Sequence, residues 1–126
     1  MTQITYPKAV NGRLNCASQP QTDGVLLEVG ALVNAQDGAV IDIEGEGFTD
    51  SNGQIPIPNT KITARQFVNP DHNTHGFEQK LQGWDALKLM DGGFFKGSYK
   101  INGGSATSRL IAVSFKNAAG QYCDEI

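Results

Sequence analysis

The sequence lacks the long apolar and basic segments that are typical of membrane proteins and nucleic-acid-binding proteins. No window approaches the roughly 18 consecutive apolar residues that a membrane-spanning helix needs. Residues 1–10 have neither the basic region nor the apolar region of a secretory signal. The 10 Lys and Arg residues are scattered and are outnumbered by 13 Asp and Glu residues, which argues against non-specific binding to phosphates. We therefore expect a soluble protein that binds neither membranes nor nucleic acids.

Cysteine is scarce, because the chain has only Cys16 and Cys123, near opposite ends. Two cysteines do not make a disulfide framework, and the state that we expect is two free thiols, as in a reducing compartment. If the terminal strands are neighbours, however, a bridge would close a loop of about 100 residues. Neither cysteine has a nearby histidine or a C-x-x-C partner, which argues against a catalytic thiol.

Motifs for nucleophilic catalysis and for nucleotide binding are also missing. The chain has no G-x-S-x-G, and its two histidines have no obvious serine partner. Its Gly-Gly pairs lack the spacing of phosphate-binding loops. The sequence therefore favours a protein that is not an enzyme.

Glycine is plentiful, with 15 residues, and the charged fraction is only 18%, which favours an all-β protein with little helix. Asn-Gly and Asp-Gly pairs supply the positive φ values of tight hairpin turns. Six such pairs separate short alternating segments: Asn11-Gly12, Asp23-Gly24, Asp37-Gly38, Asn52-Gly53, Asp91-Gly92 and Asn102-Gly103. This punctuation predicts a single-domain antiparallel β-sandwich of about seven to eight short strands over residues 1–126, with a small β-barrel as the alternative.

Individual strands follow from period-two alternation. We predict strands over Val25–Val33, Val40–Glu44, Ile55–Ile57 (a sheet edge, because of Pro56 and Pro58), Lys61–Val68, and a terminal hairpin of Phe94–Ile101 with Thr107–Phe115. Residues 1–15 are expected to form a loosely ordered arm, in which Ile4–Asn15 is alternatively a strand broken by Pro7 and Asn11-Gly12. Cys16–Asp23 and Asn69–Thr74 are expected to be loops. In Glu78–Met90, a short helix competes with a strand that begins at Trp84.

The segment Gly30 to Ile57 carries a recurring combination of turn and strand residues. They are Gly30, Val33, Asp37 and Gly38, the strand around Ile41 and Ile43, and then Thr49, Asp50, Asn52, Gly53 and Ile55. This combination resembles the carboxypeptidase-regulatory-like and bacterial immunoglobulin-like modules, although it lacks the Pro-x-x-Gly-Ala segment that those modules carry before the second strand. The resemblance covers under a quarter of the chain and implies no catalytic residues.

Both histidines lie in the polar stretch from Asp71 to Glu78. His72, His75 and Glu78 could supply three ligands to zinc or another transition metal and leave one position for water, as in a metal-dependent enzyme. The spacing H-x-x-H-x-x-E is not the i, i+4 pair of helical zinc sites. The alternative is a polar surface loop whose histidines face solvent or form local hydrogen bonds.

An acidic stretch offers oxygen ligands for calcium, namely Asp42, Glu44, Glu46, Asp50 and Asn52. An EF-hand is excluded, because aligning Gly53 with its invariant glycine places Phe48 where the first aspartate belongs. An irregular calcium loop stays open, but outward carboxylates on a solvated strand explain the pattern better.

Aromatic residues gather beside carboxylates in the second half of the chain. The side chains of Trp84, Asp85, Asp91, Phe94 and Tyr99 could form a platform for a carbohydrate, although a lone Trp among apolar residues also fits the core. The first function that we predict is a binding or structural module that self-associates into a homo-oligomer or larger assembly. The partly apolar second face of Val25–Val33 and the apolar terminal hairpin motivate this prediction. Carbohydrate binding and a metal-dependent enzyme are the alternatives.

Overall fold

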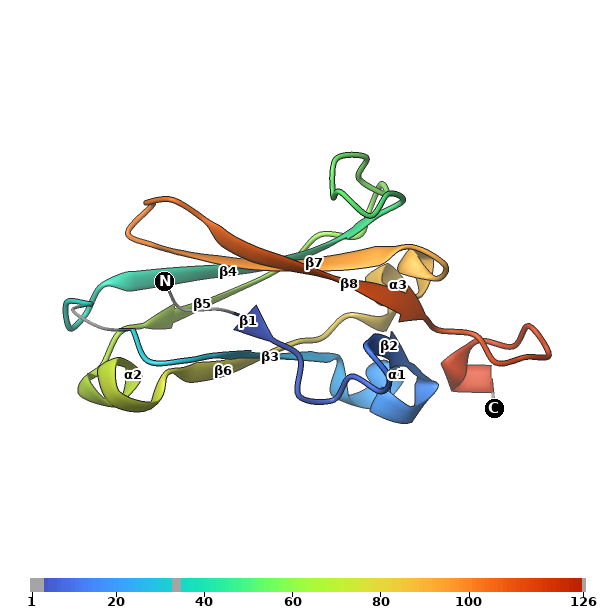
Figure 1. Ribbon diagram of the computed structural model, residues 1–126, viewed down its shortest axis with the longest axis horizontal. Coiled ribbons are helices and arrows are strands. Elements are labelled where there is room, and N and C mark those ends of the chain that lie inside the picture. Colours follow the sequence, from blue (N-terminus) through green and yellow to red (C-terminus); the bar gives the residue numbers. More distant parts are fainter. Residues whose placement is uncertain (1–3, 33–34, 126) are drawn as a thin grey trace.

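Two sheets pack face to face in the computed structural model, which describes residues 4–32 and 35–125 (Figure 1). The smaller sheet has the order β1-β3-β6, and the larger has the order β2-β8-β7-β4-β5. The strands are β1 (Ile4–Thr5), β2 (Arg13–Asn15), β3 (Val25–Val29), β4 (Val40–Phe48), β5 (Ile62–Phe67), β6 (Phe77–Leu81), β7 (Phe94–Ile101) and β8 (Thr107–Ser114). This arrangement confirms the predicted all-β sandwich, and the sheets do not close into a barrel.

All but one of the strand pairs among the described residues are antiparallel. The exception is β2, which runs parallel to β8 with Leu14 opposite Val113. The predicted terminal hairpin is confirmed as β7 and β8, with Phe95 opposite Ile111. Its turn places Asn102 and Gly103 at φ values of 50° and 72°, which is the conformation that an Asn-Gly turn adopts at low cost.

The core lies between the sheets. It is formed by the inward residues of each strand, among which Leu27 of β3, Ile41 of β4 and Phe95 of β7 are fully buried. The Tyr6 hydroxyl links the backbones of β7 and β8, because it donates to the Arg109 carbonyl at 2.6 Å and accepts from the Gly97 amide at 2.9 Å. Buried residues therefore alternate along β3, β4 and β7, as expected for strands that were predicted from a period-two pattern.

Short helices join the strands. The helices η1 (Cys16–Ser18), α1 (Pro20–Asp23) and α2 (Pro70–His75) occupy segments that were predicted to be loops. The helices α3 (Trp84–Leu87) and η2 (Lys88–Met90) agree with the helical alternative for Glu78–Met90, and η3 (Cys123–Glu125) lies near the end of the chain. Asn69 begins α2, since its side chain accepts from the His72 amide while the His72 ring accepts from the Asn69 amide. The loop prediction for Asn69–Thr74 was wrong because this capping box, followed by Pro70 at the first turn, stabilises a helix.

Four other segments differ from the sequence-based expectations. The amino-terminal arm is anchored in the core, because Ile4 and Leu14 are 1% and 2% exposed. The segment Ile55–Ile57 forms only an isolated bridge, between Phe48 and Pro56. Residues 78–81 belong to β6 and the helix begins only at Trp84. Strand β3 ends at Val29, and residues 33–34 of the predicted strand lie outside the described residues.

Cys16 and Cys123 form a disulfide that joins η1 to η3, with their Cα atoms 5.2 Å apart. The expectation of free thiols is therefore wrong. The parallel pairing of β2 with β8 explains the bridge, because Asn15 ends β2 opposite Ser114 of β8. The Cys123 amide then bonds back to the Phe115 carbonyl at 3.1 Å. The two cysteines become neighbours only through this pairing of distant segments.

Candidate functional site

The histidines of the predicted metal site lie on α2 and the glutamate lies on β6. His72 is 9% exposed, and its Nδ1 atom accepts from the Asn69 amide at 3.3 Å, so it serves as part of the helix cap. His75 and Glu78 are exposed and share a shallow hollow with His72. Within residues 4–32 and 35–125, no three His, Cys, Asp or Glu side chains are grouped closely enough to hold a metal ion. The structure therefore does not bring the three predicted ligands together as a metal-binding site.

The residues of the predicted aromatic platform are dispersed. Trp84 packs against Phe115 at a ring distance of 5.7 Å, and Asp91 accepts from the Phe115 amide at 2.7 Å. Tyr99 is 6% exposed and faces the core, whereas Phe94 lies opposite Phe48 on β4. Asp85 is exposed on α3. No single surface therefore unites the five residues that the sequence suggested.

The acidic stretch divides between a strand and a loop. Asp50 accepts at 2.9 Å from the amides of Gln54 and Ile55, and these backbone hydrogen bonds hold the pKa of the Asp50 carboxyl below its usual value. Its carboxylate therefore shapes the loop after β4. Asp42 and Glu44 instead face outward from β4, as alternation predicted, and are half-buried.

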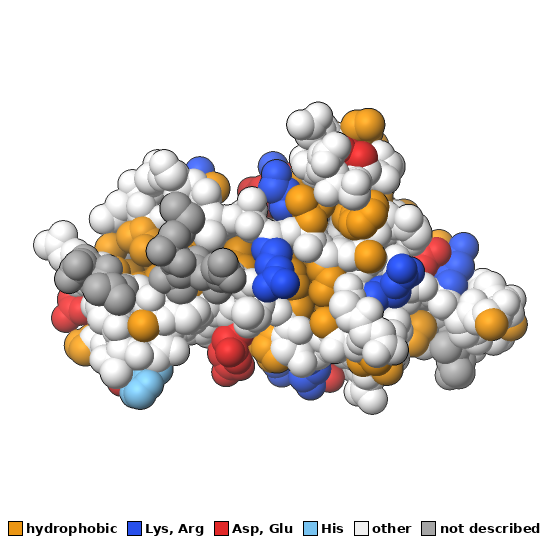
Figure 2. Space-filling model, in the orientation of Figure 1, with side chains coloured by type: hydrophobic (Ala, Val, Ile, Leu, Met, Phe, Trp, Pro, Cys, Tyr) orange, Lys and Arg blue, Asp and Glu red, His pale blue; other side chains and the backbone are white. Residues whose placement is uncertain are grey.

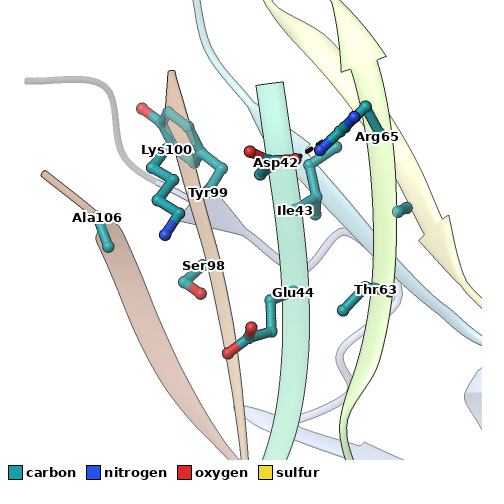
Figure 3. A pocket seen from close by; sticks show the side chains of 10 residues that line it. Asp42, Ile43, Glu44, Thr63, Arg65, Ser98, Tyr99, Lys100 and Ala106 are labelled. Carbon is teal, nitrogen blue, oxygen red and sulfur yellow. Dashed lines mark hydrogen bonds and ion pairs between the residues drawn. The ribbon is translucent and has the colours of Figure 1, made fainter. Parts of the chain in front are cut away.

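A hollow of about 620 Å³ lies on the outer face of the five-stranded sheet, over β5, β4 and β7 (Figure 3). We call it the outer-face groove. Its lining consists of Asp42, Ile43, Glu44, Thr63, Ala64, Arg65, Ser98, Tyr99, Lys100 and Ala106. Strand register places the outward side chains in two rows across the sheet. One row is Arg65, Asp42 and Lys100, and the other is Thr63, Glu44 and Ser98.

Two ion pairs organise these rows. The Arg65 Nε atom lies 3.0 Å from an Asp42 carboxylate oxygen, and Lys61 Nζ lies 3.8 Å from Glu44. Figure 3 shows Arg65 turned toward Asp42, whereas the polar ends of Glu44, Ser98 and Lys100 gather over β4 and β7. The side chains of Asp42 and Glu44 remain 35% and 42% exposed, so that they are accessible to a ligand.

Two projections rise from the sheet on either side of the outer-face groove. One is the end of the β7–β8 hairpin, which contributes Ala106, and the other is the loop that follows β4 (Figure 1). This loop is held against the sheet, since a Cβ atom on Gly53 would lie 3.1 Å from Leu110. Lys96 Nζ lies 5.1 Å from the centre of the Phe48 ring beneath it. The surface is lower between the two projections (Figure 2).

The outer-face groove offers hydrogen-bond donors and acceptors to a polar ligand. Two carboxylates and two cations balance one another, and Thr63 and Ser98 add hydroxyl groups that both donate and accept. Sequence reasoning had predicted outward carboxylates at Asp42 and Glu44 and a strand over Lys61–Val68. It did not find the site, because the pairing of β4 with both β5 and β7 joins residues that lie up to 58 positions apart in the chain.

Comparisons of the chain with protein-family models, with curated proteins and with solved structures found no match. The helices in the described part of the chain are all too short or too polar to cross a lipid bilayer. Function must therefore be argued from the site itself.

Proposed function

We propose that the chain is a non-enzymatic binding module that recognises a carbohydrate in the outer-face groove. The supporting observation is the balance of its polar groups: Asp42 and Glu44 offset Arg65 and Lys100, beside two hydroxyl-bearing side chains. A sugar carries many hydroxyl groups and no net charge, so that it can use both donors and acceptors. A strongly anionic or cationic ligand would leave half of these charges without a favourable partner.

The exposure of the outer-face groove argues for binding without catalysis. General acid–base chemistry and transition-state stabilisation are strongest in sites that exclude water. Here the side chains of Asp42 and Glu44 are 35% and 42% exposed, and each has a basic partner. The carbohydrate class agrees with one alternative from the sequence, but the surface differs, because the proposed contacts replace those of Trp84 and its neighbours.

A glycan array, followed by affinity electrophoresis with soluble polysaccharides, tests this proposal. Glu44→Gln keeps the side-chain shape but removes a charged acceptor, so we expect about tenfold weaker binding, as loss of one charge-assisted hydrogen bond predicts. The matched control is Glu78→Gln on β6, whose exposed carboxylate lies outside the outer-face groove, and it should bind like the wild type. An array that stays blank with and without calcium, or equal binding by Glu44→Gln, would contradict the proposal.

Self-association remains a second proposal, and it is supported by the outer edge of β5, which pairs with no other strand in the described part of the chain. Val40 exchanges backbone and side-chain hydrogen bonds with Asn102 after β7, so the backbone groups of Ile41 and Ile43 face β5. By the same alternation, Thr63, Arg65 and Phe67 direct their N–H and C=O groups to the free edge. Phe67 is also 58% exposed. Free edges with apolar side chains are templates for pairing with another strand.

Light scattering over a wide concentration range tests edge pairing. We expect a dimer that dissociates on dilution, and Phe67→Lys should favour the monomer because it replaces the exposed ring by a charge on the edge. Ile55→Lys is the matched control, since Ile55 is 59% exposed but lies in the loop after β4. A wild-type monomer at every concentration would remove this proposal and leave carbohydrate binding untouched.

A further inference from the structure

Polar side chains cross the five-stranded sheet from one edge to the other. Thr63 of β5 is opposite Glu44 of β4, Glu44 is opposite Ser98 of β7, and Ser98 is opposite Ser108 of β8. Three hydroxyl groups and one carboxylate therefore form a row across four adjacent strands. Thr63, Glu44 and Ser98 line the outer-face groove, and Ser108 continues the row beyond this lining. With strands about 4.8 Å apart, the row spans about 14 Å.

No strand among residues 4–32 and 35–125 pairs with the sheet beyond either end of this row. Strand β5 is the last in the order, and β2 pairs with β8 only at Ala112–Ser114, so that it does not extend to Ser108. Thr63 and Ser108 are both exposed. The loop after β4 and the β7–β8 hairpin rise on the two other sides, toward the ends of the strands (Figure 1). Figure 2 shows the depression that lies between these two projections.

We infer that the outer-face groove binds an internal segment of a linear, uncharged polysaccharide, with the sugar chain running across the strands. This inference rests on the proposed carbohydrate function and names the part of the ligand that is recognised. A site for a chain end or a monosaccharide is closed on one side, whereas this row is open at both ends. Repeated hydroxyl groups along a sugar chain match the repeated hydroxyl groups of Thr63, Ser98 and Ser108.

Chain length is the variable that tests the inference. The probes are a β-glucan, a mannan, a xylan and a dextran, and then oligosaccharides of one to six units cut from whichever polymer binds, measured by calorimetry. We expect affinity to rise with length until the row is filled and then to level off, with the monosaccharide at least hundredfold weaker than the longest oligomer. Reducing the terminal aldehyde of that oligomer to an alcohol should change its affinity by less than twofold.

Variants at the two ends of the row provide a second measurement. Thr63→Ala and Ser108→Ala should each weaken binding of the hexasaccharide by threefold to tenfold, and should affect a short oligomer bound at the centre less. Thr74→Ala is the matched control, because Thr74 is an exposed residue of α2 outside the groove. Equal melting temperatures verify that the variants fold.

The outcomes separate this inference from the proposal on which it rests. Equal affinity for the monosaccharide and the hexasaccharide, or loss of binding on reduction of the chain end, would show recognition of an end and overturn the inference alone. No binding to any of the four polymers or to the glycan array would overturn both.

Discussion

Reduction of the disulfide between Cys16 and Cys123 is the change for which we predict the largest loss of stability. The bridge links residues separated by 107 positions, so it closes almost the whole chain into a loop. In the chain-entropy model, a cross-link of this span destabilises the unfolded ensemble by about 4.8 kcal/mol at 25 °C. Because small domains are stable by only about 5 to 15 kcal/mol, reduction should remove a large part of the free energy of unfolding.

The same free energy converts into a change in the melting temperature. At about 2.1 cal/mol/K per residue, unfolding of 126 residues has an entropy of about 265 cal/mol/K, so the loss corresponds to about 18 °C. Scanning calorimetry of the oxidised protein, and of the protein fully reduced and checked by mass, measures this difference. The double variant Cys16→Ala, Cys123→Ala should melt near the reduced wild type in both buffers.

Two results would refute this reasoning. Two titratable thiols in the unreduced, denatured protein would mean that the bridge does not form. A shift of less than about 5 °C on complete reduction would mean that loop closure is not the main contribution, since the entropy model requires several times that shift. Disulfides persist in oxidising environments, so we also expect the chain to mature outside a reducing cytosol.

Three further substitutions probe the core and the helix cap, each measured by urea unfolding. Gly97→Ala should cost about 1 to 3 kcal/mol, because its Cβ atom would lie 2.7 Å from both the Tyr6 hydroxyl and Leu27; a cost below about 0.5 kcal/mol would contradict the close packing. Tyr6→Phe should cost about 1 to 3 kcal/mol at neutral pH. Burial raises the pKa of Tyr6, so the neutral phenol stabilises the fold below the unfolded value of about 10 and this contribution is lost as the pH rises further. The wild type should therefore lose stability more steeply than Tyr6→Phe above about pH 10, and parallel profiles would refute this. Asn69→Ala should cost about 1 kcal/mol through loss of the α2 cap, and no change would mean that the cap is dispensable.

Sequence patterns predicted the structure well where the residues that determine it are close together in the chain. Alternation identified the strands β4, β5, β7 and β8 and the outward carboxylates of β4, and Asn102-Gly103 predicted the turn between the last two strands. Prediction failed at α2 because composition alone suggested a loop, although Asn69 and Pro70 form a helix start. It also failed for Ile55–Ile57, where Asp50 binds the loop backbone and leaves only an isolated bridge to Phe48.

By itself, the sequence determined the fold class, the main strands and the outward direction of Asp42 and Glu44, because alternation and turn chemistry act within a few residues. Only the tertiary structure decided which strands are neighbours. That decision paired β2 with β8, and so joined Cys16 to Cys123, and it aligned Thr63, Glu44, Ser98 and Ser108 in one row. Both results depend on register between distant segments, which is set by packing of the whole core and is not encoded in any local pattern.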